Sequence, residues 1–372
     1  MNMKKVCVVT AARSEYGLLR WIIDELYHTD NIELQLIVTG SHLSPEQGLT
    51  YKQIEEDGYS ITKKIEFLLS SVSSVGIAKS MGICGMSIAE TFADLRPDLL
   101  VVLGDRYELL PICSTALTMG IPIAHISGGD ITEGAIDNQV RNAVTMLSTL
   151  HFPGTSESAL NIQRMIGSNK HIYNVGEPGL DSFIRTSLME RKEIAESINI
   201  DSNKKWILMT LHPETYCSIE ENLKMANDLM SVLESIKNIE IIITAANADL
   251  GGNEMNNIYK EFAAKNAHIH FIHSLGHLRY LSTMSESWCL IGNTSSGIVE
   301  APFLGIPVIN IGNRQKGRHI CCNIINISNK DCLSITKILS HIPAKHEPDY
   351  YYGDGNTAQK VVTTIKRYFN LA

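Results

Sequence analysis

No apolar run in this 372-residue chain exceeds about eight residues, which is too short for a helix that spans a bilayer. The opening stretch MNMKKVCVVT passes directly into a strand-like pattern and leaves no room for a secretory signal. Lys and Arg form no long cluster, and their 32 residues are outnumbered by 40 Asp and Glu. We therefore expect a cytoplasmic protein that binds neither nucleic acid nor membrane.

Several common functional motifs are also missing. The eight cysteines are scattered without a CxxC pair or a zinc-like Cys/His spacing, which predicts reduced thiols. The histidine-rich segment HIHFIHSLGH (268–277) has a strand pattern and no accompanying carboxylate or cysteine, so it does not indicate a metal site. Neither GxxxxGK[ST] nor GxGxxG follows the first predicted strand. An ATPase and an NAD enzyme are therefore both disfavoured.

What the sequence does contain is a regular alternation of strand-like and helix-like segments. The runs KKVCVVTA, DLLVVLGD, IPIAHIS and HIYNVG are typical of buried strands. Apolar spacing predicts helices over 15–28, 75–95 and 138–151. An α/β alternation of this kind predicts a doubly wound parallel sheet.

The alternation starts again after Asp201, with KKWILMTLH, IEIIITAAN, WCLIGN and IPVINIG as the strand-like runs. The chain is longer than one domain of roughly 100 to 200 residues, so two domains are expected. GEPGLDS (176–182) has the two glycines and the proline of a hinge. We expect Rossmann-like domains over 1–178 and 179–356, and a helix over 357–372 that packs on one of them, with the N-terminal domain favoured.

Polar residues follow the predicted strands, and in open α/β sheets ligands bind beyond those carboxyl ends. Arg13 and Asp105 do so in the first half, and His212, Asn247 and Asp249 in the second. Turn residues and helix caps are also found at strand ends, so one such residue carries little weight. Together they predict a ligand site, in a cleft between two facing sheets.

The segment GNTSSGIVEAP (292–302) predicts an anion site at a helix start. Its turn residues Asn293, Ser295, Ser296 and Gly297 leave backbone N–H groups free, and the helix dipole there favours a diphosphate. Glu300 lies one turn further on, where its carboxylate suits the two hydroxyls of a ribose. The pattern indicates a nucleoside diphosphate rather than a simple phosphate.

A basic loop follows the next strand. NRQKGRH (313–319) carries Arg314, Lys316 and Arg318. Cations beside an anion-binding helix start suit a diphosphate leaving group, although a solvated surface loop has the same composition.

Taken in order, the motifs are similar to those of the hydrolysing UDP-N-acetylglucosamine 2-epimerases of bacterial sialic-acid-type sugar synthesis. The resemblance covers nearly the whole chain and is specific in its order and spacing. It rests on TAARSEYGLL, VTGSHL, LGDRYE, HISGGDITEGAIDNQVRNA, LHPET, NAD, IGNTSSGIVEAP and NIGNRQKGR. It implies two domains of the GT-B type facing a cleft, a UDP-sugar as substrate, release of UDP, no cofactor, no metal, and a homodimer.

The resemblance also implies a use for the acids of HISGGDITEGAID (125–137). Such enzymes remove the C2 proton while UDP leaves from C1, and then add water across the double bond with a proton on the opposite face. Proton-transfer groups are therefore needed on both faces of the sugar. The implied catalytic residues are Asp105, Asp130, Asp137 and His212. The resemblance places Arg13, Ser295, Ser296, Glu300 and Arg318 on UDP-binding motifs. The other predicted substrate-binding residues are Glu133, Asn247, Asn293, Gly297 and Arg314.

The sequence departs from the family pattern at two places. Ala11 and Ala12 stand where relatives commonly have a glycine and a hydroxyl, which predicts an altered contact near the diphosphate. Asp130 stands where many relatives have Glu, one methylene longer, so the acid is expected to reach its target differently. Glu133 is either a further participant or a solvated charge at a helix start.

Alternatives remain at the level of both class and substrate. A GT-B glycosyltransferase would share the diphosphate helix and Glu300, but would have no use for acids on both faces of C2. A UDP-sugar binding protein would not need Asp105, Asp130 and His212 at strand ends. Within the leading class, the substrate is UDP-N-acetylglucosamine, giving N-acetylmannosamine, or alternatively UDP-2,4-diacetamido-2,4,6-trideoxyglucose of the legionaminic-acid route.

Overall fold

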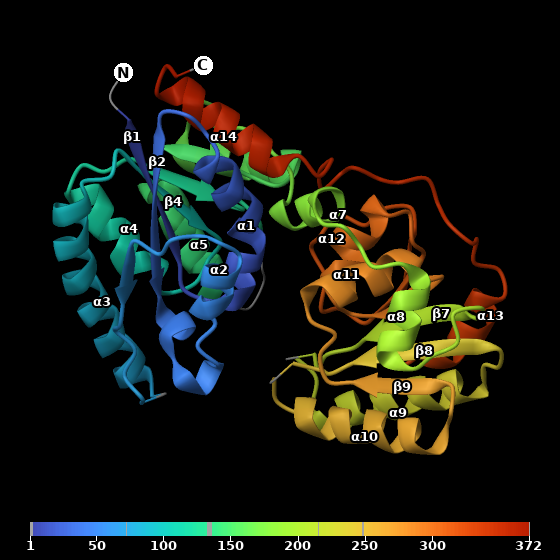
Figure 1. Ribbon diagram of the computed structural model, residues 1–372. Helices are drawn as coiled ribbons and strands as arrows, with labels where there is room; N and C mark the ends of the chain where they lie inside the picture. The colour runs from blue at the N-terminus through green and yellow to red at the C-terminus, as the bar shows by residue number, and fades with distance from the viewer. Residues whose placement is uncertain (1–2, 72, 132–135, 215, 248, 372) are drawn as a thin grey trace. The chain divides into compact units, whose positions relative to one another are not determined.

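The computed structural model describes residues 3–71, 73–131, 136–214, 216–247 and 249–371. The chain forms two compact units (Figure 1). Unit 1 comprises Met1–Ser182 together with Gly353–Ala372, and unit 2 comprises Phe183–Tyr352. No helix within the described ranges has both the length and the apolar character that a membrane crossing requires.

Unit 1 contains a six-stranded parallel sheet in the order β3-β2-β1-β4-β5-β6. The strand bounds are β1 Lys4–Thr10, β2 Ile32–Thr39, β3 Lys63–Ile65, β4 Leu99–Leu103, β5 Ile123–Ile126 and β6 Leu150–Phe152. The longer helices are α1 Arg13–Tyr27, α2 Tyr51–Glu56, α3 Ser74–Leu95, α4 Leu109–Thr118, α5 Ile136–Leu147, α6 Ser156–Ile166 and α14 Thr357–Tyr368.

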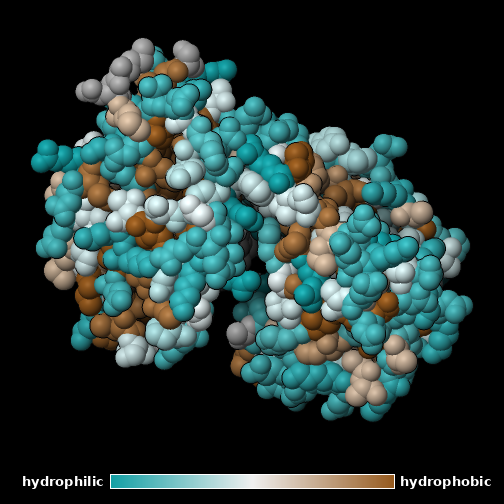
Figure 2. Space-filling view, viewed as in Figure 1, coloured by the Kyte–Doolittle hydropathy of each residue, from teal (hydrophilic) through white to brown (hydrophobic). Residues whose placement is uncertain are grey.

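Both faces of this sheet are covered, because successive strand residues point to opposite sides. Val6 and Val8 of β1 belong to an apolar cluster with α1 and α14. Cys7 and Val9 belong to a second cluster with α3, α4 and α5. In Figure 2 the surface of each unit is mostly hydrophilic on the face shown, as expected when helices cover hydrophobic strands.

The C-terminal helix α14 belongs to unit 1 because its first turn is capped there. Asp181 is fully buried, and its two carboxylate oxygens accept the backbone N–H groups of Thr357 and Ala358, each at 2.8 Å. Val361 and Ile365 then pack in the same apolar cluster as α1. A carboxylate at a helix start also complements the helix dipole.

Unit 2 repeats the architecture with the order β12-β11-β10-β7-β8-β9, again all parallel. Its strands are β7 Lys205–Thr210, β8 Ile239–Thr244, β9 Ile269–Ile272, β10 Cys289–Gly292, β11 Val308–Ile311 and β12 Ile324–Ile327. Its helices are α7 Asp181–Arg185, which begins in unit 1, α8 Arg191–Ile198, α9 Ile219–Ser235, α10 Gly252–Lys265, α11 His277–Glu286, α12 Ser296–Phe303 and α13 Ile335–Leu339. Two Rossmann-like parallel sheets are therefore confirmed.

Two local predictions in unit 1 are wrong. The helix predicted over 138–151 ends at Leu147, and Leu150–Phe152 forms strand β6, paired with β5. HIYNVG contributes only an isolated bridge between Ile172 and His151, not a strand. Ser148 and Thr149 separate α5 from β6 by too few residues for hydrophobic periodicity to mark the change.

Candidate active site

Unit 1 presents its acidic residues just beyond the carboxyl ends of two neighbouring strands. Asp105 follows β4, and Asp130 follows β5 through the glycines of the SGG turn. Asp137 lies in the first turn of α5. Since β4 and β5 pair directly, all three acids come from adjacent segments at one edge of the sheet. Glu133, the fourth acid of the sequence prediction, lies outside the described residues.

Arg141 links these segments. Its guanidinium Nη2 donates to the carboxylate of Asp105, and its Nη1 donates to the backbone oxygen of Asp130 at 2.8 Å. Arg141 is only 6% exposed. It was absent from the predicted site, although it stands four residues after Asp137, the spacing that places two side chains on one face of a helix.

The carboxyl group of Asp137 has a raised pKa. Partial burial is the main cause, and the negative charge of Asp105 raises the pKa further, while Arg141 and Arg106 lower it. Two neighbouring carboxylates that share a cation make a suitable acid–base pair, because one of them can hold a proton near neutral pH more readily than an isolated Asp.

Asp130 is fixed by the start of α6. Its carboxylate accepts a hydrogen bond from Ser158 Oγ, and Thr155 caps the same helix turn through the backbone N–H of Ser158. Gly129 has φ +85°, and a Cβ at this position would overlap with the carbonyl oxygen of Ser158. The glycine therefore allows the Asp130 loop to approach α6 closely.

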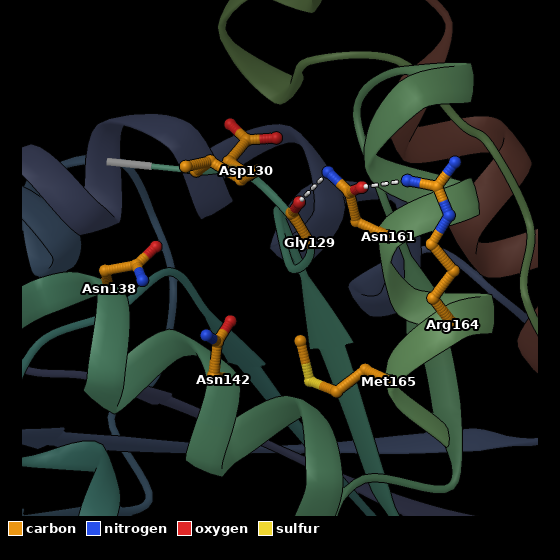
Figure 3. Close-up of a pocket in the computed structure, with 8 residues that line it drawn as sticks. Gly129, Asp130, Asn138, Asn142, Asn161, Arg164 and Met165 are labelled. Atoms are coloured by element: carbon orange, nitrogen blue, oxygen red, sulfur yellow. Dashed lines mark hydrogen bonds between the residues drawn. The ribbon is translucent and has the colours of Figure 1, made fainter. Parts of the chain in front are cut away.

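A pocket of about 420 Å³ lies under this loop, between α5 and α6. Its lining includes Asn138, Asn142 and Met165 (Figure 3). Asn161 donates to the backbone oxygen of Gly129 at 3.0 Å and accepts from Arg164 at 3.3 Å. In Figure 3 the Asp130 carboxylate points away from the pocket, so the loop backbone separates the two.

The departure at Ala11 and Ala12 has a structural explanation. Ala12 is the N-cap of α1 and has no side chain that can cap it. Instead, the carboxylate of Glu15 accepts the backbone N–H of Ala11 at 2.6 Å. Glu15 is 4% exposed, and burial raises its pKa to about 7 despite this hydrogen bond. Arg13, at the first position of α1, remains exposed.

In unit 2, His212 is oriented from both sides. The side-chain oxygen of Asn293 accepts the backbone N–H of His212 at 2.8 Å, and its amide nitrogen donates to the backbone oxygen of His212 at 2.9 Å. The ring Nδ1 accepts the backbone N–H of Asn247 at 3.0 Å. Burial, and secondarily the charge of Arg314, lower the pKa of His212 to about 4. The ring is therefore neutral at pH 7 and carries its proton on Nε2, where it can donate.

The predicted anion site is built at the start of α12, which follows β10. Ser295 is exposed and Ser296 is the first helical residue. A Cβ on Gly297 would lie 3.1 Å from side chains of Leu290 and Val308, so glycine lets the helix pack close to the sheet. Glu300 follows one turn later, and burial raises its pKa although Arg318 and Ser296 lower it.

Two acceptors on predicted site residues of unit 2 are buried and have no donor among the described residues. They are Glu300 Oε2 and Asn247 Oδ1. A buried polar atom without a partner is costly, and a ligand donor such as a hydroxyl would satisfy it. The amide nitrogen of Asn247 donates to Asp249 Oδ2 at 2.6 Å, and this hydrogen bond fixes the orientation of the Asn247 amide oxygen.

The basic loop after β11 places two guanidinium groups close together. The pKa of Arg314 is lowered mainly by partial burial of its side chain. The positive charge of Arg318 lowers it further, and the negative charge of Asp249 raises it. Both arginines are exposed. The backbone N–H groups of Asn313 and Arg314 donate to the buried carboxylate of Glu214, a residue that the sequence analysis quoted within LHPET without a role. Adjacent cations on an anchored loop suit a diphosphate.

Within the ranges that the structure describes, no group of three or more His, Cys, Asp or Glu residues is arranged to hold a metal ion. His270 instead contacts the buried carboxylate of Glu240 at 2.6 Å, and Lys204 contacts the same group at 2.7 Å.

The chain has two Rossmann-like sheets. Neighbouring acids follow the strands of one sheet, and a helix start with nearby arginines follows the strands of the other. This combination is typical of the class of nucleotide-sugar enzymes. A family model described as UDP-N-acetylglucosamine 2-epimerase matches residues 24–366, and the chain belongs to this family. The resemblance inferred from the sequence is thereby confirmed.

Individual relatives agree with this assignment. The chain is 38% identical to the GDP/UDP-N,N'-diacetylbacillosamine 2-epimerase (hydrolyzing) of Campylobacter jejuni, over 88% of this chain and 85% of the relative. It is 29% identical to the UDP-N,N'-diacetylbacillosamine 2-epimerase (hydrolyzing) of Legionella pneumophila, over 98% and 96%. The crystal structure of UDP-GlcNAc 2-epimerase from Neisseria meningitidis bound to UDP-GlcNAc has the same fold, with a TM-score of 0.76 at 19% identity over 98% and 100%.

Proposed function

We propose that this UDP-sugar 2-epimerase is of the hydrolysing type. Its substrate is a UDP-2-acetamido sugar, and its products are UDP and the free sugar with inverted configuration at C2. The observation that carries the proposal is the Asp105–Arg141 pair beside Asp137, whose carboxyl pKa is raised. A glycosyltransferase has no need of such a pair at C2.

The reaction balances in two steps. A carboxylate of the Asp105 and Asp137 pair takes the C2 proton, the C1–O bond breaks, and UDP leaves, which gives a 2-acetamidoglycal. Water then adds its oxygen to C1 while a proton reaches C2 on the opposite face. Asp130 and the neutral His212 are the remaining proton-transfer groups. The guanidinium groups of Arg314 and Arg318 and the start of α12 stabilise the leaving diphosphate. Ser295, Ser296 and Glu300 bind the nucleotide.

The sugar that we favour is the UDP-2,4-diacetamido-2,4,6-trideoxyglucose of the sequence analysis. The support is that the two relatives described above are named as diacetylbacillosamine 2-epimerases. UDP-N-acetylglucosamine, giving N-acetylmannosamine, is the second candidate. A homodimer and a cytoplasmic location are parts of the same proposal.

Turnover on the two nucleotides tests both levels of the proposal. Each is incubated with the protein in heavy water and without any acceptor, and the products are examined by proton NMR. The expected result is UDP and a free sugar with deuterium at C2 and inverted configuration, formed faster from the diacetamido substrate. Hydrogen retained at C2, or retained configuration, means hydrolysis or glycosyl transfer and contradicts the proposal. Faster turnover of UDP-N-acetylglucosamine contradicts only the choice of sugar.

A further inference from the structure

The loop 313–319 carries both arginines of the proposed diphosphate site, and its beginning is firmly attached. Glu214 accepts the backbone N–H of Arg314 at 3.1 Å. Gln315 is 5% exposed and donates to the backbone oxygen of Asn293 at 2.8 Å. These contacts fix the loop around Arg314, directly beside His212 and the start of α12.

The end of the loop depends on different contacts. From Lys316 to Ile320 the residues are exposed. Gly317 has φ +95°, and the backbone N–H of Arg318 reaches Gln315 O only at 3.3 Å. Backbone bonds of the loop alone therefore hold Arg318 weakly, at a place where the charge of Arg314 repels it.

Two consecutive tyrosines hold the residue next to Arg318. The ring of Tyr351 stacks on the ring of His319, with 3.6 Å between centroids and 14° between planes. Tyr352 donates its hydroxyl to the backbone oxygen of His319 at 2.8 Å, and Tyr352 is only 6% exposed. One residue is thus fixed through both its side chain and its backbone.

Tyr351 and Tyr352 are themselves well placed to be rigid. Their rings contact each other edge to face, with centroids 5.0 Å apart. The backbone N–H of Tyr351 donates to Asp349 Oδ1 at 2.9 Å, and Asp349 N donates to Pro302 O at 3.0 Å, at the end of α12. The tyrosines are therefore attached to the same helix that carries Ser296 in its first turn and Glu300 one turn later.

We propose that Tyr351 and Tyr352 are positioning residues that hold His319, and through it Arg318, for binding of the diphosphate. This inference rests on the proposed function, because it needs Arg318 to contact UDP. The physical gain is preorganisation: an arginine on an ordered loop loses less conformational freedom on binding than one on a mobile loop. Neither tyrosine needs to contact the ligand.

Four variants separate positioning from general stability. Tyr352→Phe removes the hydroxyl that reaches His319, and Tyr351→Ala removes the stacked ring. Tyr351→Phe keeps a ring that can stack and is the conservative counterpart. Tyr59→Phe is the matched control, because Tyr59 is 7% exposed and loses an equivalent 2.8 Å hydrogen bond, to Asp24 in unit 1.

The readout is the affinity of the full-length protein for UDP by calorimetry and for uridine by ligand-observed NMR. We expect Tyr352→Phe and Tyr351→Ala each to weaken UDP binding about 3- to 10-fold, the effect of one lost contact. Uridine affinity should not change, because Arg318 acts on the phosphates. Tyr351→Phe and Tyr59→Phe should match the unaltered protein for both ligands.

A double-mutant cycle with Arg318→Ala completes the test. If the tyrosines act through Arg318, Tyr352→Phe has no further effect on UDP affinity when Arg318 is already absent. The inference is overturned if both tyrosine variants bind UDP normally, if UDP and uridine weaken equally, or if the effects of Tyr352→Phe and Arg318→Ala are additive. Absence of UDP binding by the unaltered protein would instead refute the proposed function. Should Tyr351→Ala fail to fold, Tyr352→Phe still decides.

Discussion

Replacing Arg141 by Gln is the most direct test of the acid pair in unit 1. The substitution removes the cation that contacts Asp105 and Asp130 O and leaves a shorter, neutral amide in its place. Because Arg141 lowers the pKa of Asp137, its loss should raise that pKa further. More of the Asp137 carboxyl group is then protonated at a given pH, and less of it can accept the C2 proton.

The magnitude follows from the geometry. Two unit charges about 4 Å apart interact by about 4 kcal/mol at an effective dielectric constant near 20. The side chain of Asp105 is 29% exposed, so water screens part of this interaction and about 1 to 3 kcal/mol remains. We expect kcat on the acid limb of the pH profile to fall about 10- to 100-fold, since 1.4 kcal/mol corresponds to a factor of ten.

The assay is the pH dependence of kcat, measured by UDP release with saturating nucleotide sugar. The expected signature is an acid limb that moves to higher pH, so that the loss of activity shrinks as the pH rises. Arg141→Lys should restore part of the activity at low pH, because it keeps the charge but not the two-pronged geometry. Arg164→Gln is the matched control, since Arg164 is an exposed arginine on α6 that donates to the side-chain amide oxygen of Asn161. An acid limb that stays in place in Arg141→Gln would refute the electrostatic argument.

Three further outcomes are expected. Glu300→Ala should weaken UDP binding by about 1 to 3 kcal/mol in calorimetry, and unchanged affinity would remove Glu300 from the nucleotide site. His212→Asn should lower kcat by roughly 10² to 10⁴ with little change in the unfolding midpoint, so parallel losses of both would indicate a structural role. Glu15 has a folded-state pKa of about 7, so its contribution to the free energy of unfolding is complete below its unfolded pKa and is lost, by about 3 kcal/mol, as the pH rises through 7. Glu15→Gln should therefore show a smaller fall in the free energy of unfolding between pH 5 and pH 8, measured by denaturant titration.

Sequence patterns predicted the sheets well because buried parallel strands are nearly continuous apolar runs, as in β4 and β8. They failed near Leu147, where α5 gives way to β6 within a few residues. Short edge strands were missed too: β3 and β12 present exposed residues beside buried ones, and β3 has only three residues. Such strands depend on pairing with a neighbour rather than on a local pattern.

Candidate site residues could be predicted to the extent that they lie near the ends of strands. His212 and Glu300 are predictions of this kind, and the structure shows the environment of each. Arg141, Glu214 and Glu15 were missed because their partners lie far away in the sequence or on the backbone. Glu214, for example, accepts N–H groups about 100 residues later, at Asn313 and Arg314. Hydrophobic periodicity carries no information about such contacts.

The capping of α14 by Asp181 has a consequence for the order in which the protein folds during synthesis. Unit 2 is one continuous stretch, Phe183–Tyr352, and can complete its core as soon as it has left the ribosome. Unit 1 begins before unit 2 but needs Val361 and Ile365, which are translated after all of unit 2, to cover its α1 face. Until then the carboxylate of Asp181 lacks the two N–H groups that it binds in the folded protein. Unit 1 is therefore completed only after unit 2 has been synthesised, and the face that α14 covers stays exposed in the meantime.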